Sequence, residues 1–414
     1  MAGHVRKRRL SDGRVSYQAR LPTSSRPRKV IVKTFARRRD AERWLTGQAA
    51  AIHDGSFIDP RHDAKPFRDL ITTWERTHLP KLAPKSRERY ESVTRTYLIP
   101  RFGSTPLGKL SRAAFKEWFA SLAAEHKPDG KPRYAPGTLR KVQVVLSSIL
   151  SEGIELGLLR ENPAARLRLP SPPRTEMTIL TADEIKALAD AIERASDRLA
   201  IYVAAYCGLR AGELWALQRR DIDLLHNRLY VRRALKDLRG HLEFGDTKTT
   251  GSRRTVSLPA FLGAMLAEHM ETMPASPDAL LFVSTGGGGT RQAGDGGPIR
   301  HSLFVRRVFK PAIIGDEDNE DEKKRRKPAL SAEKHNLRFH DLRHTCASLL
   351  IAAGAHPKLI QARLGHSSIT TTLDRYGHLF PSVEAALADA LDATFNGAGA
   401  PTQLREVKPS TPRG

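Results

Sequence analysis

The chain of 414 residues carries 69 Lys and Arg against 45 Asp and Glu, which gives a formal net charge of +24. With 40% hydrophobic residues it has enough apolar material for several cores, so a wholly disordered chain is excluded. The excess of cations predicts a polyanionic partner such as DNA or RNA. A membrane partner is not expected, because the longest apolar run, Leu199 to Leu209, is shorter than the ~20 residues that span a bilayer.

Targeting and redox signals point to the cytoplasm. The first ten residues are basic, but no apolar stretch follows them, so no secretory signal is predicted. Cys207 and Cys346 both lie in apolar sequence of helical type. We therefore expect two buried thiols in a reducing compartment, with no disulfide and no cysteine-type zinc site.

Residues 1–60 are predicted to form a small basic module of three strands and one helix. The strand-like segments are 5–10, 15–22 and 29–36. The helix is expected from Arg38 to Ile52. This segment holds 14 Lys and Arg against 5 Asp and Glu, and the cations fall on strands as well as loops. A solubilising surface would explain the composition, but the placement on strands favours a DNA contact.

The next segment, 66–168, is predicted to be entirely helical, and 61–65 is interpreted as a linker before it. Apolar residues recur at helical spacing, and prolines separate the runs. We expect four or five helices whose aromatic residues form a core and are not platforms for stacked bases. These aromatic residues are Phe67, Trp74, Phe115, Trp118 and Phe119.

A proline-rich connector at 169–178 leads into a larger mixed domain, 179–396. Thr181 and Glu184 form a capping box that begins its first helix. Strands are expected at 228–235, 241–247 and 253–259. Helices are expected at 181–194, 197–219, 259–273, 301–313, 340–353, 357–364 and 368–376. The Gly-rich stretch 284–298 and the charged stretch 316–327 are interpreted as loops, and 397–414 as a disordered tail.

Cutting a phosphodiester without a metal ion requires a particular set of side chains. Negative charge on the non-bridging oxygens must meet preorganised cations, and the planar fork of arginine grips two oxygens at once. An acid must protonate the leaving oxygen, and a hydrogen-bond acceptor must assist a nucleophile of high pKa.

The third domain contains such a set in chain order. Its members are Arg210, Glu213, Lys248, His340, Arg343, His366 and Tyr376. The first arginine and the glutamate lie three residues apart, so they would share a helical face, and so would the histidine and arginine of His-x-x-Arg. The lysine follows at the turn between the second and third expected strands. The last histidine belongs to Leu-Gly-His, and the tyrosine comes ten residues later.

This pattern resembles the tyrosine recombinases, and specifically their phage-integrase branch. The shared elements are Gly-x-Arg-x-x-Glu-Leu, a hairpin lysine, His-x-x-Arg, Leu-Gly-His and a tyrosine, in that order over about 179–381. The resemblance implies a multidomain α+β protein. A sheet-plus-helix module at 1–60 would bind arm-type DNA, an all-α domain at 66–168 would bind the core site, and 179–396 would be a mixed, mainly α catalytic domain with a small antiparallel sheet.

The resemblance also implies a role for each residue. Tyr376 would attack the scissile phosphate, leaving a 3′-phosphotyrosine and a free 5′-hydroxyl. Arg210 and Arg343 would bind the non-bridging oxygens. Lys248 would protonate the 5′-oxygen as general acid, and His340 would assist the tyrosine as base or proton acceptor.

Two further positions of the pattern, His366 and Glu213, are given supporting roles. His366 would hydrogen-bond the phosphate, and Glu213 either orients its neighbours or is a carboxylate on a helix surface. One phosphoester is exchanged for another, so neither ATP nor metal is required and no cofactor is expected. A tyrosine of pKa near ~10 is mostly protonated at neutral pH, so surrounding cations are expected to favour its ionised form.

Several nearby residues are set aside. His344 and His378 lie close to the motifs but outside the family pattern, and we expect them to support the site or lie on the surface. Lys236 competes with Lys248 as the hairpin lysine, which we prefer for its Thr-Lys-Thr setting. Tyr202 and Tyr206 are expected in the core.

The C-terminal part predicts a short amphipathic helix. Its apolar stripe is Val383, Leu387, Leu391 and Phe395. It would pack on its own domain or dock into a neighbouring protomer, and the resemblance favours docking. The assembly implied is a homotetramer on double-stranded DNA at the nucleoid, integrating and excising a mobile element. An excisionase and a host DNA-bending protein are further candidate partners.

Three rival interpretations are weighed against this one. The first is a type IB topoisomerase, which relaxes supercoils by the same chemistry; the basic module and the C-terminal helix argue against it. The second is a non-catalytic DNA-binding protein of the same fold, which the intact residue set disfavours. The third is a chromosome-dimer resolvase, which would lack the basic N-terminal module.

Overall fold

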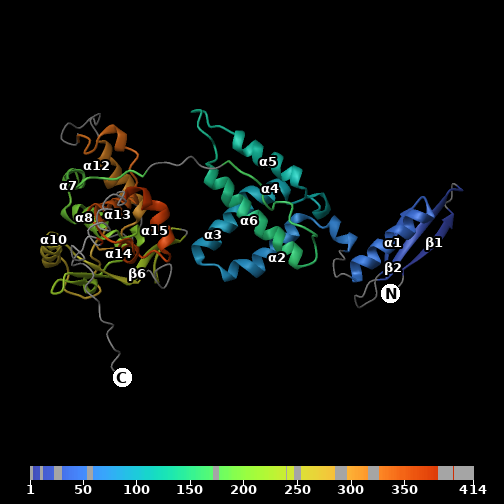
Figure 1. Cartoon of the computed structure of the whole chain (residues 1–414), viewed down its shortest axis with the longest axis horizontal. Helices are drawn as coiled ribbons and strands as arrows, with labels where there is room; N and C mark the ends of the chain where they lie inside the picture. Colours follow the sequence, from blue (N-terminus) through green and yellow to red (C-terminus); the bar gives the residue numbers. More distant parts are fainter. Residues whose placement is uncertain are drawn as a thin grey trace, which may run out of the picture. The chain divides into compact units, whose positions relative to one another are not determined.

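The computed structural model describes residues 3–9, 13–22, 30–53, 59–170, 177–238, 240–246, 253–284, 296–315, 326–380 and 395. The chain divides into two compact units, Met1–Arg174 and Thr175–Gly414, which are described separately below (Figure 1). Within the described residues, no helix has the length and apolar character needed to cross a bilayer.

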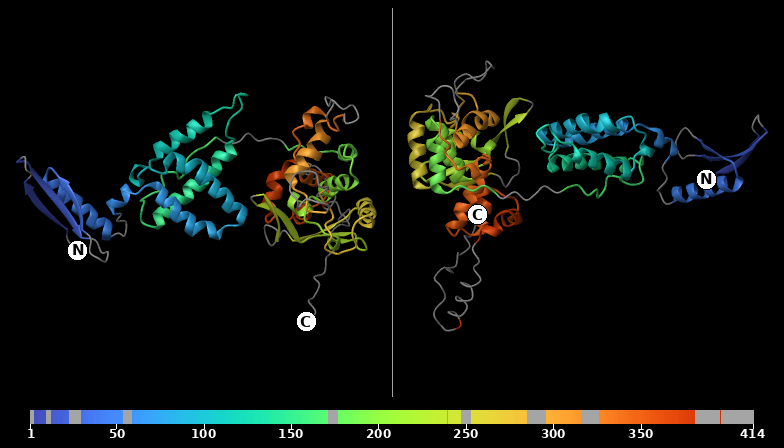
Figure 2. Two further views of the ribbon diagram at one scale, coloured as in Figure 1. Left: turned by 180° about the vertical axis from the view of Figure 1, so that it is seen from behind. Right: turned by 90° about the horizontal axis from the view of Figure 1, so that it is seen from above.

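The first unit begins with a three-stranded antiparallel sheet covered on one face by a helix. Its elements are β1 (His4–Arg9), β2 (Val15–Pro22), β3 (Val30–Phe35) and α1 (Arg38–His53). The strand order is β1-β2-β3, and α1 packs on the sheet (Figure 2). Ala19, Leu21 and Ile31 are buried, since alternate residues of a strand point to the same face. The predicted sheet-plus-helix module is confirmed.

The rest of the first unit is helical. It comprises α2 (Phe67–His78), α3 (Pro84–Val93), α4 (Ile99–Phe102), α5 (Arg112–Ala124) and α6 (Pro136–Glu155). Proline occupies the first position of α3 and α6, where its missing N–H costs nothing, and the Ser111 side chain caps α5. The expected aromatic residues are all buried in one core. A 3-10 turn, Pro60–Ala64, occupies the segment interpreted from sequence as a linker.

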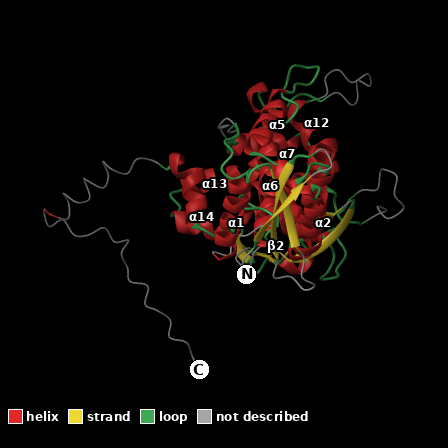
Figure 3. Ribbon diagram, turned by 90° about the vertical axis from the view of Figure 1, so that its right-hand side faces the viewer, coloured by secondary structure: helices red, strands yellow, loops and turns green. Residues whose placement is uncertain are grey.

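Within the described residues, the second unit is mainly helical with two small antiparallel sheets, where the sequence predicted one. Figure 3 colours the helices and strands of both units. The sheets have the orders β4-β5-β8 and β6-β7. Their strands are β4 (Ile222–Asp223), β5 (Arg228–Val231), β6 (Arg233–Leu238), β7 (His241–Asp246) and β8 (Arg254–Ser257). The helices are α7 (Ala182–Asp190), α8 (Ala195–Cys207), α9 (Ala211–Leu214), α10 (Ala260–Glu271), α11 (His301–Phe304), α12 (Lys310–Ile314), α13 (Asp341–Ala352), α14 (Pro357–Leu364) and α15 (Ile369–Tyr376).

Three predicted elements of this unit are interrupted in the structure. The strand expected at 228–235 is two strands, β5 and β6, that belong to different sheets. The helix expected at 197–219 breaks after α8, because Gly208 adopts a left-handed conformation. The helix expected at 301–313 is α11 and α12 joined by a π-helical turn, Val305–Phe309. The sequence offered a sign at two of these places: Gly208 follows α8, and Arg232 and Arg233 interrupt the apolar residues between β5 and β6.

Helix α8 lies at the centre of the second unit and is buried on almost every side. Helix α13 packs directly against it, and α14 and α15 add a smaller apolar cluster that includes Tyr376 and Cys346. Cys207 and Cys346 are buried free thiols, as predicted. This packing brings the ends of α8, α14 and α15 together, although they are far apart in sequence.

Several predictions lie outside the described residues. They concern Lys248, the Gly-rich segment at 285–295, the charged segment at 316–325, the amphipathic helix at 383–394 and the tail at 397–414.

Candidate active site

The end of α8 places Arg210 beside α14. Gly208 has a φ of 63°, which side chains disfavour. A Cβ there would also lie 2.7 Å from Leu364 Cδ2 and 3.0 Å from Cys346 Sγ. Glycine therefore lets the chain turn sharply against the neighbouring helices, and Arg210 follows as the residue that begins α9.

Glu213 is buried between two arginines, with 3% of its surface exposed. Its Oε1 accepts a hydrogen bond from Arg210 Nη1 at 2.7 Å, and its Oε2 accepts from the Arg210 backbone N–H at 3.0 Å and from Arg254 Nη2 at 2.9 Å. Burial alone would raise the pKa of this carboxyl, but Arg254 and Arg210 outweigh it and hold the pKa below its ordinary value. The alternative of a helix-surface carboxylate is therefore wrong.

Arg343 projects from α13 and is 2% exposed. Its Nη1 donates to the Gly208 carbonyl at 2.6 Å, and its Nη2 donates to the Leu364 carbonyl. Burial, together with the nearby Arg210 and Arg254, lowers the pKa of Arg343 to about 9. The guanidinium therefore stays cationic at neutral pH and is held in a fixed orientation.

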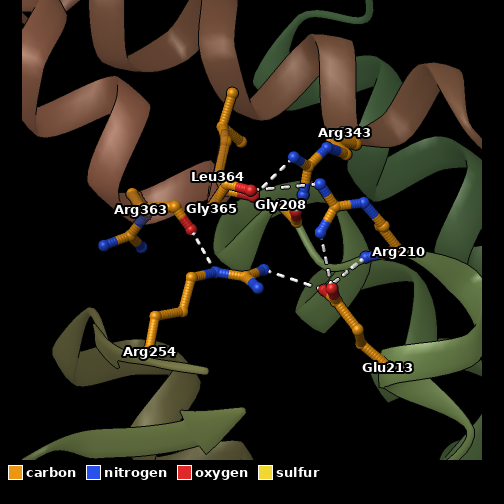
Figure 4. Close-up of polar contacts among 8 residues, drawn as sticks. All are labelled: Gly208, Arg210, Glu213, Arg254, Arg343, Arg363, Leu364 and Gly365. Atoms are coloured by element: carbon orange, nitrogen blue, oxygen red, sulfur yellow. Dashed lines mark hydrogen bonds and ion pairs between the residues drawn. The ribbon is translucent and has the colours of Figure 1, made fainter. Parts of the chain in front are cut away.

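Three successive carbonyls at the end of α14 each accept from a different arginine (Figure 4). Arg254 Nε donates to the Arg363 carbonyl at 2.6 Å, and Arg210 Nη2 donates to the Gly365 carbonyl at 3.1 Å. The Leu364 carbonyl between them accepts from the α13 arginine. The last carbonyls of a helix lack intrahelical partners and carry its negative partial charge. The helix end therefore gathers cations that would otherwise repel one another.

Tyr376 is the last residue of α15 and has no exposed surface. Its hydroxyl lies 2.7 Å from Nδ1 of His344, in the middle of α13. The His366 ring lies parallel to the tyrosine ring at a centroid distance of 6.5 Å, and its Nδ1 is 2.9 Å from Thr372 Oγ1. His340 precedes α13 and stays exposed, with its ring edge-on to His344 at 5.1 Å.

Comparison with known proteins agrees with this arrangement. The model of the phage integrase family matches residues 178–382, and that of the phage integrase N-terminal SAM-like domain matches residues 66–123. The chain belongs to the phage integrase family. It is a DNA-binding, tyrosine-type site-specific recombinase, and nothing in the matches favours a DNA-relaxing topoisomerase.

Curated relatives that match this integrase include integrases of mycobacterial phages. The integrase of Mycobacterium phage D29 is 29% identical over 347 residues, covering 81% of this chain and 83% of that protein. The integrase of Mycobacterium phage L5 is 27% identical over 371 residues, covering 87% of this chain and 90% of that protein.

Solved integrases share the fold. The Tn1549 transposon integrase in complex with transposon right end DNA has a TM-score of 0.61 and 20% identity, covering 80% of this chain and all of that one. A lambda integrase tetramer bound to a Holliday junction has a TM-score of 0.52 and 20% identity, covering 89% of this chain and 93% of that one.

The hydroxyl of Tyr376 in this integrase is held in its protonated form. Burial raises the pKa of Tyr376 to about 12, although the positive charges of Arg343 and Arg375 oppose the shift. The sequence analysis expected neighbouring cations to favour ionisation, but desolvation is the larger effect here.

Two of the histidines around the integrase tyrosine, His344 and His366, are neutral at neutral pH. Burial lowers the pKa of His344 and of His366 to about 4, and loss of hydration with the nearby Arg343 also lowers the pKa of His340. A neutral imidazole offers one acceptor nitrogen, so each ring can accept a hydrogen bond or a proton.

The sequence analysis missed two residues of this site. His344 was set aside, yet it is the hydrogen-bond partner of Tyr376; its position one helical turn after His340 was the available signal. His378, set aside with it, is exposed. Arg254 was mentioned only as part of a strand. Arg254 lies two residues before Val256, which is buried, so both point to the core-facing side of β8. A basic residue at such a position was the available signal.

Lys248 belongs to the segment 247–252 between β7 and β8, outside the described residues. The described residues on either side of that segment form an ion pair, with Arg253 Nη2 at 2.5 Å from Asp246 Oδ1. The described chain resumes at Arg253, next to Arg254, which contacts the arginine and glutamate cluster directly.

Proposed function

We propose that this recombinase cleaves DNA through Tyr376, with Arg210 and Arg343 holding the scissile phosphate. The observation that supports this most strongly is the row of carbonyls at the end of α14, which sets two arginines side by side next to the tyrosine helix. Preorganised cations of this kind stabilise the charge that develops on a phosphoryl group.

In the proposed step, the Tyr376 oxygen forms a bond to phosphorus as the bond from phosphorus to the 5′-oxygen breaks. The product is a 3′-phosphotyrosine, and the released 5′-oxygen takes its proton from Lys248. His340 accepts the tyrosine proton, and His366 hydrogen-bonds a phosphate oxygen. Attack by the 5′-hydroxyl of another strand reverses the step, so no external energy source is consumed.

The burial of Tyr376 adds a requirement to this proposal. The side chain has no exposed surface, and its hydroxyl is bonded to His344. The hydroxyl must become exposed before it meets a phosphate. Cleavage would therefore include a displacement of α15, the short helix that carries the tyrosine.

For the N-terminal module, residues 1–60, we propose binding of arm-type DNA through the sheet face opposite α1. The antiparallel register aligns alternate residues of the three strands on that face. They are His4, Arg6 and Arg8 on β1, Gln18 and Arg20 on β2, and Val32 and Thr34 on β3. Sheets that read DNA enter the major or the minor groove, and in the major groove arginine and glutamine side chains bond base edges.

We further propose that the helical domain at 66–168 and the catalytic domain at 179–396 bind the core site together, as a homotetramer on two DNA segments. Support comes from similar proteins: one solved neighbour is a lambda integrase tetramer bound to a Holliday junction. The reaction would integrate and excise a mobile element at the nucleoid. An excisionase and a host DNA-bending protein would set its direction.

The test is covalent capture of DNA by the purified chain. The probe is a pool of nicked duplexes with a randomised centre, whose nick lets the 5′-hydroxyl fragment diffuse away. Wild-type protein should give complexes that survive denaturant, and sequencing of the attached DNA should show a preferred core. Mass spectrometry should find the nucleotide on Tyr376, and end-labelling should show a 3′ linkage.

Tyr376→Phe is the matched variant, because it removes only the hydroxyl. It should bind the selected duplex with wild-type affinity and form no covalent complex. Covalent capture by this variant would overturn the assignment of the nucleophile. Relaxation of supercoiled plasmids of any sequence, without recombinant products, would instead favour a topoisomerase.

A further inference from the structure

Arg254 is a buried cation to which the proposed chemistry gives no task. It lies on β8, and only 6% of its side chain is exposed. Its Nη2 donates to Glu213 Oε2 at 2.9 Å, and its Nε donates to the Arg363 carbonyl at 2.6 Å. One guanidinium therefore joins three elements: β8, α9 and the end of α14.

These two hydrogen bonds act on the parts that hold Arg210. Glu213 accepts from Arg210 through both its carboxylate oxygens, and the Gly365 carbonyl accepts from Arg210 Nη2. Arg254 bonds the same carboxylate and a carbonyl two residues before that glycine. Any motion of Glu213 or of the α14 end would move Arg210 as well.

The burial of the Glu213 carboxylate explains why a second hydrogen-bond donor lies here. Glu213 faces charged groups on three elements: Arg210 at the start of α9, Arg254 on β8 and Arg343 on α13. Removing a buried carboxylate from water is unfavourable unless it is paired and fully hydrogen-bonded. Arg254 is the more buried of its two direct partners, with 6% of the side chain exposed against 34% for Arg210.

We propose that Arg254 is a positioning residue for DNA cleavage, which anchors Glu213 and the α14 end so that Arg210 stays aimed at the scissile phosphate. This inference rests on the proposed function of Arg210. Arg254 does not touch the phosphate itself, because its Nε and Nη2 are engaged and the side chain is buried. Lysine cannot replace it fully, since an ammonium lacks the planar fork that spans a carboxylate and a carbonyl.

The first measurement is the single-turnover rate of covalent complex formation at saturating selected duplex. Arg254→Met keeps the apolar stem and removes the fork. It should slow cleavage roughly 100-fold, the scale expected when a catalytic group is misplaced by about 1 Å. Arg254→Lys, which restores the charge alone, should recover part of the rate. The dissociation constant for the duplex should change little in either variant.

The second measurement asks whether Arg254 acts through Glu213. Two groups that work as one unit give non-additive losses. We therefore expect Arg254→Met to slow cleavage by a far smaller factor in a Glu213→Gln background than in the wild type. Losses that multiply would mean that Arg254 acts on the DNA independently, and the proposal would be wrong.

The pH profile separates positioning from a general weakening of the fold. Without Arg254, the pKa of the Glu213 carboxyl should rise, because its better buried cation is gone. Arg254→Met should then lose additional activity as pH falls below neutral, where Glu213 becomes protonated and releases Arg210. A profile parallel to wild type, with a lower rate throughout, would contradict the positioning role.

Arg220→Met is the matched control, since Arg220 belongs to the same domain, has a side chain that is 46% exposed, and forms its ion pair with exposed Asp278. It should cleave saturating duplex at the wild-type rate. Thermal unfolding of each variant checks folding. A wild-type rate for a folded Arg254→Met would refute the inference. Covalent capture by Tyr376→Phe would instead refute the proposed function, so the two failures are distinguishable.

Discussion

The N-terminal sheet and the catalytic site use the same residue type in opposite ways. Arg6 and Arg8 lie on an exposed strand, where their side chains face water. Arg210, Arg254 and Arg343 are fixed by a carboxylate and by three carbonyls at a helix end. Exposed cations raise the affinity for a polyanion, whereas fixed cations hold the reacting phosphate in a defined orientation. The net charge of the chain reports only the first of these.

The largest expected effect tests geometry at the catalytic site. Arg343→Lys keeps the positive charge but cannot donate to the Gly208 and Leu364 carbonyls with a planar fork. We expect the single-turnover cleavage rate to fall about 100-fold or more, as when one preorganised donor is lost. Binding of the selected duplex should persist, and a gel-shift assay would check this. Cleavage at the wild-type rate would show that charge alone suffices.

The next largest expected effect is a loss of stability at acid pH. It arises from the buried histidines of the catalytic domain, which the N-terminal sheet lacks. The folded pKa of His344 is about 4, below its ordinary 6.5, so the unfolded chain takes up a proton first as pH falls. The stability due to neutral His344 is therefore full above pH 6.5 and is lost toward pH 4. For a pKa shift of this size, the free energy of unfolding should fall by up to about 3 kcal/mol.

Denaturant unfolding at neutral and acid pH would measure this loss in the catalytic domain. His344→Asn is the informative variant, because its amide oxygen accepts a hydrogen bond without titrating. The variant should lose less stability on acidification than wild type. An equal loss in both proteins would assign the acid sensitivity to His340 and His366, whose pKa values are also lowered.

A smaller effect is expected for charge removal from the sheet. Arg6→Ala combined with Arg8→Ala should weaken binding to arm-type DNA. It should also reduce the slope of log affinity against log salt by about 0.9 for each phosphate that the protein no longer neutralises. Cleavage at saturating core duplex should be unchanged. A slowed cleavage step would connect the N-terminal module to the chemistry.

The smallest effect completes the comparison. Arg8→Lys exchanges one exposed cation for another, so arm-DNA affinity should stay within a few-fold of wild type unless the fork bonds a base edge. Titrations against arm duplexes that differ at single base pairs would show this. A large, base-specific loss would mean that the sheet also works by geometry, and the contrast between the two regions would disappear.

Local patterns were enough to predict the modules of this protein. Alternation and turn residues identified the three N-terminal strands, and helical spacing identified the helices of the second domain. The prediction of α14 was correct at both ends, because a proline begins it and a glycine follows it. These features depend only on residues that are neighbours in the sequence, so the sequence alone is enough to predict them.

Motif order was enough to predict a catalytic set from Arg210 to Tyr376, which stays a prediction, but only the tertiary structure decided how its described members are held. The break after α8 lies at a glycine visible in the sequence, whereas the break within 228–235 follows from the pairing of β5 with β8 and of β6 with β7, which no local pattern records. Arg254 and His344 were missed for the same reason. A hydrogen bond between residues 109 or 32 positions apart exists only once the chain has folded, and the burial that shifts a pKa does too.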